Sequence, residues 1–254
     1  MNKMVDFEGA IGNAWKFAKD KERLSVLFGL DIVSFVLAFL PMFLILRSVR
    51  PSAIGVLGLL QSLGWIFVGV IIAVLVMLFS LLMFTHNYAN QKSLGKSANF
   101  AARNYLRFLA AMVVVWVVEA ILVFVPIPIV NLALAIIAAL AFFFVSPEIA
   151  VSGNGVFNSI SNSYRLFRQN WLRVILTILL NAVLGLIIVL IFAIPFIVSL
   201  FLFILPAAIS GGVMSVLPAV IVTGLIMLVG FTLATLLTIG IQTDVYMQLK
   251  KKKN

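Results

Sequence analysis

The chain has no cysteine and a single histidine among its 254 residues. The missing thiols exclude a cysteine nucleophile and any disulfide. His86 lies outside any spacing that identifies a Ser-His-Asp triad, and neither an HExxH motif nor a glycine-rich phosphate loop is present. The sequence therefore offers no catalytic residue, and we expect a protein that is not an enzyme and that uses no cofactor.

Charge is also scarce. Asp, Glu, Lys and Arg make up 10% of the chain, hydrophobic residues make up 64%, and the mean hydropathy is +1.23. A soluble domain carries about 25% charged residues, because its surface must stay hydrated. So few charges exclude a soluble protein of 27.8 kDa and predict an all-α integral membrane protein.

Six apolar stretches are long enough for the roughly 20 residues that cross a bilayer as a helix. They are residues 24–46, a stretch within 53–84, 108–125, 129–145, a stretch within 174–205, and 217–241. The fifth stretch exceeds the membrane thickness. Pro195 predicts a break in it, because proline lacks an amide hydrogen, with an apolar elbow extending to residues 209–212. Residues 53–64 predict a similar elbow, although a tilted helix and an ordinary loop account for both stretches equally well.

The basic residues have an uneven distribution between the predicted connections. Cytoplasmic loops retain positive charge, and sixteen of the eighteen Lys and Arg residues fall on one predicted face: Lys3, Lys16, Lys19, Lys21, Arg23, Lys92, Lys96, Arg103, Arg107, Arg165, Arg168, Arg173 and Lys250 to Lys253. Only Arg47 and Arg50 fall on the other. This asymmetry predicts a multi-pass protein of the cell membrane with both termini cytoplasmic.

The cytoplasmic segments show helical periodicity. Aromatic and apolar residues recur every three or four positions at Phe157, Ile160, Tyr164, Phe167 and Trp171, and again at Phe7, Ile11, Ala14, Trp15 and Ala18. Residues 11–16 match 160–165, and residues 104–107 match 170–173. At the ends of the even-numbered spans, residues 85–88 match 243–246, and residues 146–149 occupy the same position after the fourth span. We therefore expect one membrane domain, 1–254, of three pseudo-repeated units (about 5–88, 97–149 and 154–249). Each unit is a cytoplasmic amphipathic helix followed by a hairpin of two spans.

Three segments of this pattern resemble a known group of proteins. Residues 146–148 (Ser-Pro-Glu), 162–167 (Asn-Ser-Tyr-Arg-Leu-Phe) and 170–174 (Asn-Trp-Leu-Arg-Val) are similar to a recurring block of poorly characterised six-helix membrane proteins. These include the glycerophosphodiester phosphodiesterase membrane-domain family and related families of unknown function. The resemblance implies three helical hairpins; the phosphodiesterase chemistry belongs to a separate soluble domain, for which this chain has no room.

Three polar residues fall within predicted spans, where an ionisable or amide group is costly. Asp31 lies about 12 Å into the first span at helical rise, Asn181 lies at the same depth in the fifth, and Glu119 lies nearer the second face. If these groups line one shared cavity, they could form a proton- or cation-coupled pathway. If each group instead forms a hydrogen bond to a neighbouring helix, its role is to stabilise the helix bundle.

A second set lies at the cytoplasmic ends of the even-numbered spans: His86, Glu148 and Asp244. A pseudo-threefold arrangement would bring them together at the inner mouth of a cavity. One histidine and two carboxylates resemble a metal set, but helix-end bonding to carbonyls or water explains the same residues. No local ligand motif supports the metal, so we assign none.

The leading functional prediction is a non-enzymatic membrane protein that organises or assists a membrane partner or anionic lipids. Its surface is basic and aromatic, comprising Trp15, Lys16, Phe157, Tyr164, Arg165, Phe167, Arg168 and Trp171. Anionic headgroups attract each such basic residue by about 1 kcal/mol, and no nucleic-acid partner is expected, since topology already explains the charge. The alternatives are a small transporter or channel using Asp31 and Glu119 and, with less support, a lipid-modifying membrane enzyme.

Overall fold

The computed structural model describes residues 5–48, 56–124, 126–206 and 213–251, and these form helices joined by short connections. The elements are α1 (Phe7–Ala18), α2 (Lys21–Ser48), α3 (Val56–Asn90), α4 (Leu94–Val123), α5 (Pro128–Phe142), α6 (Val145–Ser152), α7 (Val156–Ser199), the π-helical turn η1 (Leu200–Ile204) and α9 (Val213–Lys251). The expectation of an all-α chain is confirmed for the described residues.

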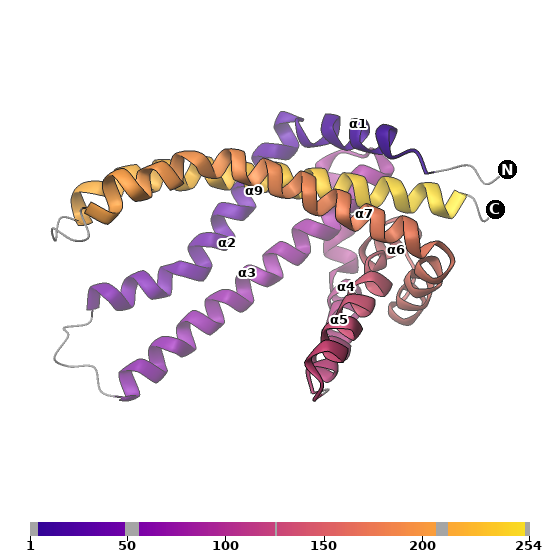
Figure 1. The fold of residues 1–254 in the computed structure, drawn as a ribbon, viewed down its shortest axis with the longest axis horizontal. Helices are drawn as coiled ribbons and strands as arrows, with labels where there is room; N and C mark the ends of the chain where they lie inside the picture. Colours follow the sequence, from indigo (N-terminus) through magenta and orange to yellow (C-terminus); the bar gives the residue numbers. More distant parts are fainter. Residues whose placement is uncertain (1–4, 49–55, 125, 207–212, 252–254) are drawn as a thin grey trace.

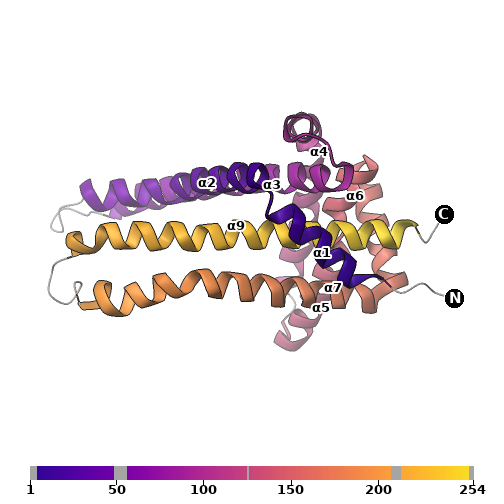
Figure 2. The ribbon, with the colours of Figure 1, turned by 90° about the horizontal axis from the view of Figure 1, so that it is seen from above.

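The long helices pack as three pairs that diverge from one end of the molecule. Helices α2 and α3, α4 and α5, and α7 and α9 are in contact, and Figure 1 shows the three pairs spreading away from the end where α1 and α6 lie. Seen from above, α9 runs between α7 and the α2–α3 pair, and α1 crosses over it (Figure 2). Helix α9 consequently contacts α1, α2, α3, α6 and α7.

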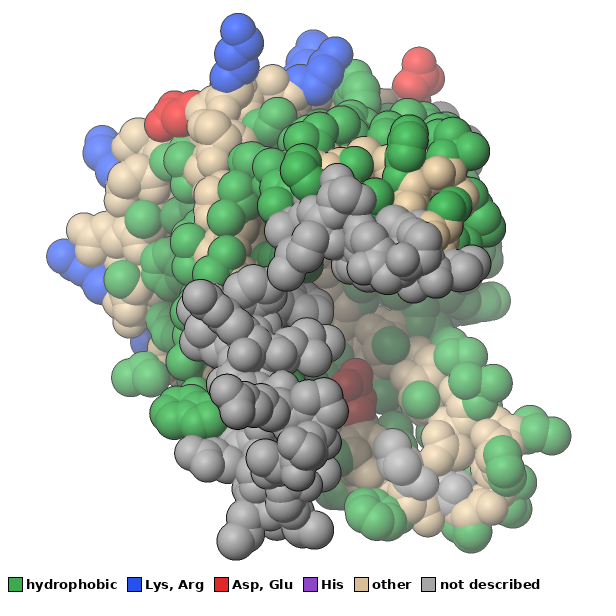
Figure 3. Space-filling view, turned by 90° about the vertical axis from the view of Figure 1, so that its left-hand side faces the viewer, with side chains coloured by type: hydrophobic (Ala, Val, Ile, Leu, Met, Phe, Trp, Pro, Cys, Tyr) green, Lys and Arg blue, Asp and Glu red, His purple; other side chains and the backbone are tan. Residues whose placement is uncertain are grey.

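Five of the described helical segments are long and apolar enough to cross a membrane: 63–90, 94–122, 128–152, 156–204 and 218–251. Their outward surfaces are apolar; Phe67, Ile129 and Phe201, for example, are 67%, 81% and 63% exposed. Figure 3 looks at the end away from α6, where the described surface is mostly hydrophobic and Lys and Arg lie near its upper and left margins. The chain therefore has the surface of a membrane protein. The first predicted span coincides with α2, but the count of six stays a prediction.

The helix boundaries correct two expectations. Helix α7 continues through Pro195 to Ser199 and then widens into η1, and its one residue with non-helical dihedral angles is Asn170 (φ −138°, ψ 31°). Proline is tolerated inside membrane helices, where neighbouring groups satisfy the freed carbonyl. Helix α3 has already begun at Val56, so no elbow occupies 56–64. Residues 53–55 and 209–212 lie outside the described residues.

The turn between the third and fourth predicted spans lies at Pro126 and Pro128. Helix α4 ends at Val123, and α5 begins at Pro128. A proline fits the first helical position, because the amide there has no partner within the helix.

The predicted apolar face of α7 is only partly buried. Ile160 and Phe167 pack against the core, whereas Phe157, Tyr164 and Trp171 are 76%, 50% and 57% exposed. The residues that face the core most closely are small or aliphatic: Ser159, Ser163, Leu166 and Val174. Small residues let helix backbones approach closely, which is how membrane helices pack.

Helix α1 docks on α9 in the same way. Its buried residues are Ala10, Ala14, Phe17 and Ala18, and Trp15 is 37% exposed. A Cβ on Gly240 of α9 would lie 2.7 Å from the Cβ of Ala14, so only glycine permits this approach. At the ends of the two helices, the Asp6 amide donates to Gln248 Oε1 at 2.9 Å, and Gln248 Nε2 donates to the Asp6 carbonyl at 3.1 Å.

Candidate functional site

The polar residues of the molecule gather where the helix pairs meet. We call this region the junction: α1, α6, residues 85–90 of α3 and residues 240–251 of α9. Helix α6 is its centre, since residues 145–150 are all buried. Pro147 lies in the first turn of α6, where it breaks no helical hydrogen bond. Gly153 ends the helix with φ 64°, a conformation that favours glycine.

Glu148 is the most enclosed charged residue of the junction, with 2% of its surface exposed. Its Oε1 accepts hydrogen bonds from Asn154 Nδ2 at 2.7 Å and Asn162 Nδ2 at 2.8 Å. Its Oε2 accepts from the Tyr246 hydroxyl and lies 3.6 Å from Lys250 Nζ. One carboxylate thereby links α6, the start of α7 and the end of α9.

Asp244 forms a similar connection between different helices. Its Oδ2 accepts from the Tyr88 hydroxyl of α3 and from Asn13 Nδ2 of α1, each at 3.1 Å. In both cases a tyrosine at the end of one helix pair donates to a carboxylate at the end of another. The sequence showed the two carboxylates but not their tyrosine donors, because tyrosine at a membrane boundary usually signals only the interface.

His86 does not join these carboxylates. Its Nδ1 lies 3.2 Å from Ser97 Oγ, and its ring stacks on Phe100 with centroids 3.9 Å apart. Within the described part of the chain, no group of three or more His, Asp or Glu residues is arranged to hold a metal ion. The predicted mouth residues therefore take separate partners.

The three polar residues predicted within spans are also separated. Thr232 Oγ1 of α9 donates to Asp31 Oδ2 at 2.6 Å, and Asn181 Nδ2 lies 3.4 Å from the Thr238 carbonyl. Asn181 Oδ1 is buried and has no hydrogen-bond partner among the described residues. Glu119 is half-buried, with no ion pair or hydrogen bond among the described residues. Asp31 and Asn181 therefore lie in different helix contacts, α2–α9 and α7–α9.

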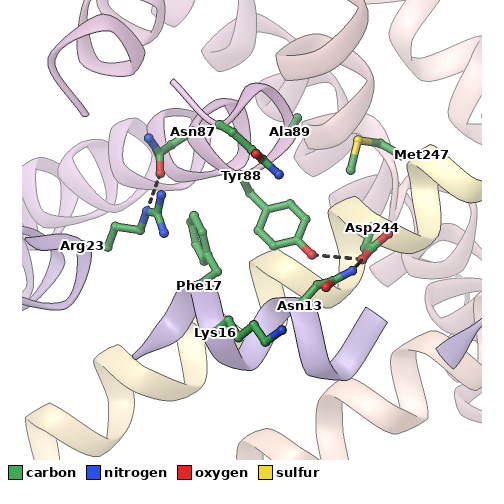
Figure 4. A pocket seen from close by; sticks show the side chains of 10 residues that line it. Asn13, Lys16, Phe17, Arg23, Asn87, Tyr88, Ala89, Asp244 and Met247 are labelled. Carbon is green, nitrogen blue, oxygen red and sulfur yellow. Dashed lines mark hydrogen bonds between the residues drawn. The ribbon is translucent and has the colours of Figure 1, made fainter. Parts of the chain in front are cut away.

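A cavity of about 520 Å³ opens beside α1 in the junction. It is lined by Asn13, Lys16, Phe17, Arg23, Asn87, Tyr88, Ala89, Gln91, Asp244 and Met247. Figure 4 shows these side chains arriving from α1, the start of α2, the end of α3 and the end of α9. None of the three polar residues predicted within spans lines it.

Arg23 is fixed against one wall of this cavity. Its Nε donates to Asn87 Oδ1 at 2.9 Å, and its guanidinium carbon lies 4.5 Å from the centroid of the Phe17 ring. Its contact with Asp20 is long, at 3.9 Å. Lys16, which also lines the cavity, has no hydrogen bond or ion pair among the described residues. From the sequence, Arg23 counted only as one of the cytoplasmic basic residues, because most of its cavity neighbours come from two distant segments, 87–91 and 244–247.

Comparison with known proteins gives one match. Residues 118–249, slightly over half of the chain, match the family model described as Domain of unknown function (DUF7847). No curated protein and no solved structure matches the chain. The resemblance to the phosphodiesterase membrane-domain family gains no support from these comparisons. The chain belongs to the family described as Domain of unknown function (DUF7847).

Proposed function

We propose that this protein is a non-catalytic membrane protein that organises anionic lipids, or a membrane partner bound with them, at a basic cytoplasmic face. The observation that carries the proposal is a row of aromatic residues on α7, which we call the α7 stripe: Phe157, Tyr164 and Trp171. Seven residues are nearly two helical turns, so Phe157 and Tyr164 share one face, and Trp171 directly follows the non-helical residue Asn170. All three are at least half exposed.

Basic residues accompany the α7 stripe. Arg165 and Arg168 are exposed, and Arg168 has no ion pair or hydrogen bond within the described ranges. Tyrosine and tryptophan favour the headgroup level of a bilayer, and arginine is attracted to its anionic lipids. Trp15 and Lys16 give α1 the same combination. Two helices of this kind support contact with headgroups along the membrane plane.

The topology proposed with this function has six spans in three repeated hairpins, with both termini cytoplasmic. Helix α2 is 28 residues long, which suffices for a sixth span. The bonds from Tyr88 to Asp244 and from Tyr246 to Glu148 support the repeat, because equivalent residues of two units each reach a different unit. The second unit has Ile149 where the other two have tyrosine.

The transporter alternative has less support. A coupled pathway needs its polar groups along one route, whereas Asp31 and Asn181 each bond α9 in a separate contact. Of the three polar residues predicted within spans, only Glu119 still supports a transporter.

The test is copurification from native membrane, with mass spectrometry of the bound lipids and proteins. The test variant replaces Phe157, Tyr164 and Trp171 together by alanine; the control replaces the exposed polar residues Asn158, Ser161 and Gln169 of the same helix. We expect the test variant to retain less anionic lipid and partner protein than the control. Equal retention by both would contradict the proposal.

A further inference from the structure

The junction cavity has the size of a ligand site and a mostly polar lining. Sites for small molecules span about 300–1,000 Å³. This cavity measures about 520 Å³, and polar or charged side chains, among them Lys16, Arg23 and Asp244, make up most of its wall. We propose that it binds the phosphoryl group of a hydroxylated ligand, such as a glycerol-type lipid headgroup. This proposal extends the lipid-organising function. It depends on that function only for the assumption that the ligand is a lipid rather than a soluble phosphate.

Two cations line the cavity and suit a phosphoryl group. The Arg23 Nε donates to Asn87 Oδ1, which fixes the guanidinium, and the one ion pair of its terminal nitrogens among the described residues is the 3.9 Å contact with Asp20. Lys16 lies on the neighbouring helix without a hydrogen-bond or ion-pair partner among the described residues. An arginine held in place and a free lysine are a common pair for phosphate oxygens.

Asp244 suits the hydroxyl end of the ligand. Its Oδ2 already accepts two hydrogen bonds, from Tyr88 and Asn13. Among the described residues, its Oδ1 has one contact, at 3.4 Å with Gln248, so it can accept a further hydrogen bond. The formal charges of Lys16, Arg23 and Asp244 sum to +1, which favours a net-negative hydroxylated phosphate over a zwitterionic aminophosphate.

The cavity also lies at the predicted level of the headgroups. Arg23 directly precedes the first predicted span, and Asn87 follows the second by three residues. Both residues therefore fall where a hydrocarbon core would give way to phosphates. This position favours a lipid over a soluble phosphate as the source.

The experiment measures binding to the purified full chain. Soluble probes are inorganic phosphate and glycerol 3-phosphate, titrated in detergent. Membrane probes are nanodiscs of phosphatidylcholine alone, or mixed with phosphatidylglycerol or with phosphatidylethanolamine, after which the retained lipid is quantified by mass spectrometry. The variants are Lys16→Gln and Lys16→Gln with Arg23→Gln. The matched controls, Lys21→Gln and Lys21→Gln with Lys19→Gln, remove one and two charges from exposed residues outside the cavity.

We expect phosphatidylglycerol to be enriched over phosphatidylethanolamine, and Lys16→Gln to weaken that binding about tenfold or more, since a hydrogen bond to a charged group is lost. The matched controls should keep the selectivity. Binding of glycerol 3-phosphate with the same dependence on Lys16 would support the site with a soluble source. Equal binding by Lys16→Gln and its matched control would overturn it. Lys16 is exposed and makes no hydrogen bond or ion pair among the described residues, so we expect Lys16→Gln to keep the fold and to carry the test without the double variant.

The outcomes separate this site from the lipid-organising function. The alanine variant of the α7 stripe should lower total anionic lipid while the selectivity for phosphatidylglycerol persists. Loss of selectivity only in the Lys16 variants would support the cavity. Selectivity that disappears only with the α7 stripe would overturn the cavity and leave the wider function standing.

Discussion

Removing the carboxylate of Glu148 should destabilise the protein more than any other single loss of charge. Glu148→Ala leaves Asn154 Nδ2, Asn162 Nδ2 and the Tyr246 hydroxyl without their shared acceptor. It also removes the ionic partner of Lys250. Lys250 is 41% exposed and can be rehydrated, so the loss comes mainly from the unpaired donors, of which the buried Tyr246 hydroxyl alone should cost about 1–3 kcal/mol. A loss of that size is a large fraction of the total stability of a domain.

The assay is thermal unfolding in detergent micelles, followed through the fluorescence of the four tryptophans. The matched control is Glu8→Ala, because Glu8 is exposed in the first turn of α1 and makes only a dipole interaction worth about 0.3–1 kcal/mol. Glu148→Gln should fall between the two, since its amide oxygen still accepts one donor. If Glu148→Ala and Glu8→Ala unfold at the same temperature, the carboxylate does not hold the three helices together.

Three further results follow from the contacts. Gly240→Ala should destabilise the chain by about 1–3 kcal/mol through overpacking against α1, whereas Gly224→Ala, which meets nothing within 4 Å, should not; equal effects in the same unfolding assay would contradict the close packing. Asp31→Asn should cost less than about 1 kcal/mol, as single hydrogen bonds between membrane helices do, and a much larger loss would show that Asp31 does more than bond Thr232. A cysteine replacing Lys92 in this cysteine-free chain should resist an impermeant thiol reagent outside intact cells, while one replacing Arg47 should react; the reverse would invert the topology.

The hydropathy of the sequence predicted the helices well, and the cause is physical. A span must be apolar and helical whatever its neighbours are, so α2, α3, α4, α5 and α9 fall where the apolar stretches lie. The buried face of each helix was harder to predict. In water, an aromatic row at helical spacing marks the core. Next to lipid the row can face outward, and on α7 it does, with Phe157 exposed and Ser159 buried.

The candidate site was predicted only in fragments. Asp244 and Lys16 were both singled out, but as members of different groups, a helix-end set and a lipid surface. Their shared cavity depends on α1 crossing α9, and the glycine that permits this crossing, Gly240, is one of 16 in the chain. Sequence spacing cannot show such a contact, because its partners are more than 200 residues apart.

The central position of α9 has a consequence for how the chain is made. The docking surface for α1 and the partner of Asp31 both belong to α9, and Asp31 precedes Thr232 by 201 residues. At about 5–20 residues per second, ribosomes need roughly 10–40 s to cover that distance. During this time α1 and α2 have no α9 to pack against. A chain that terminates early therefore exposes the small, polar faces of its first helices to the membrane and to the proteases that survey it.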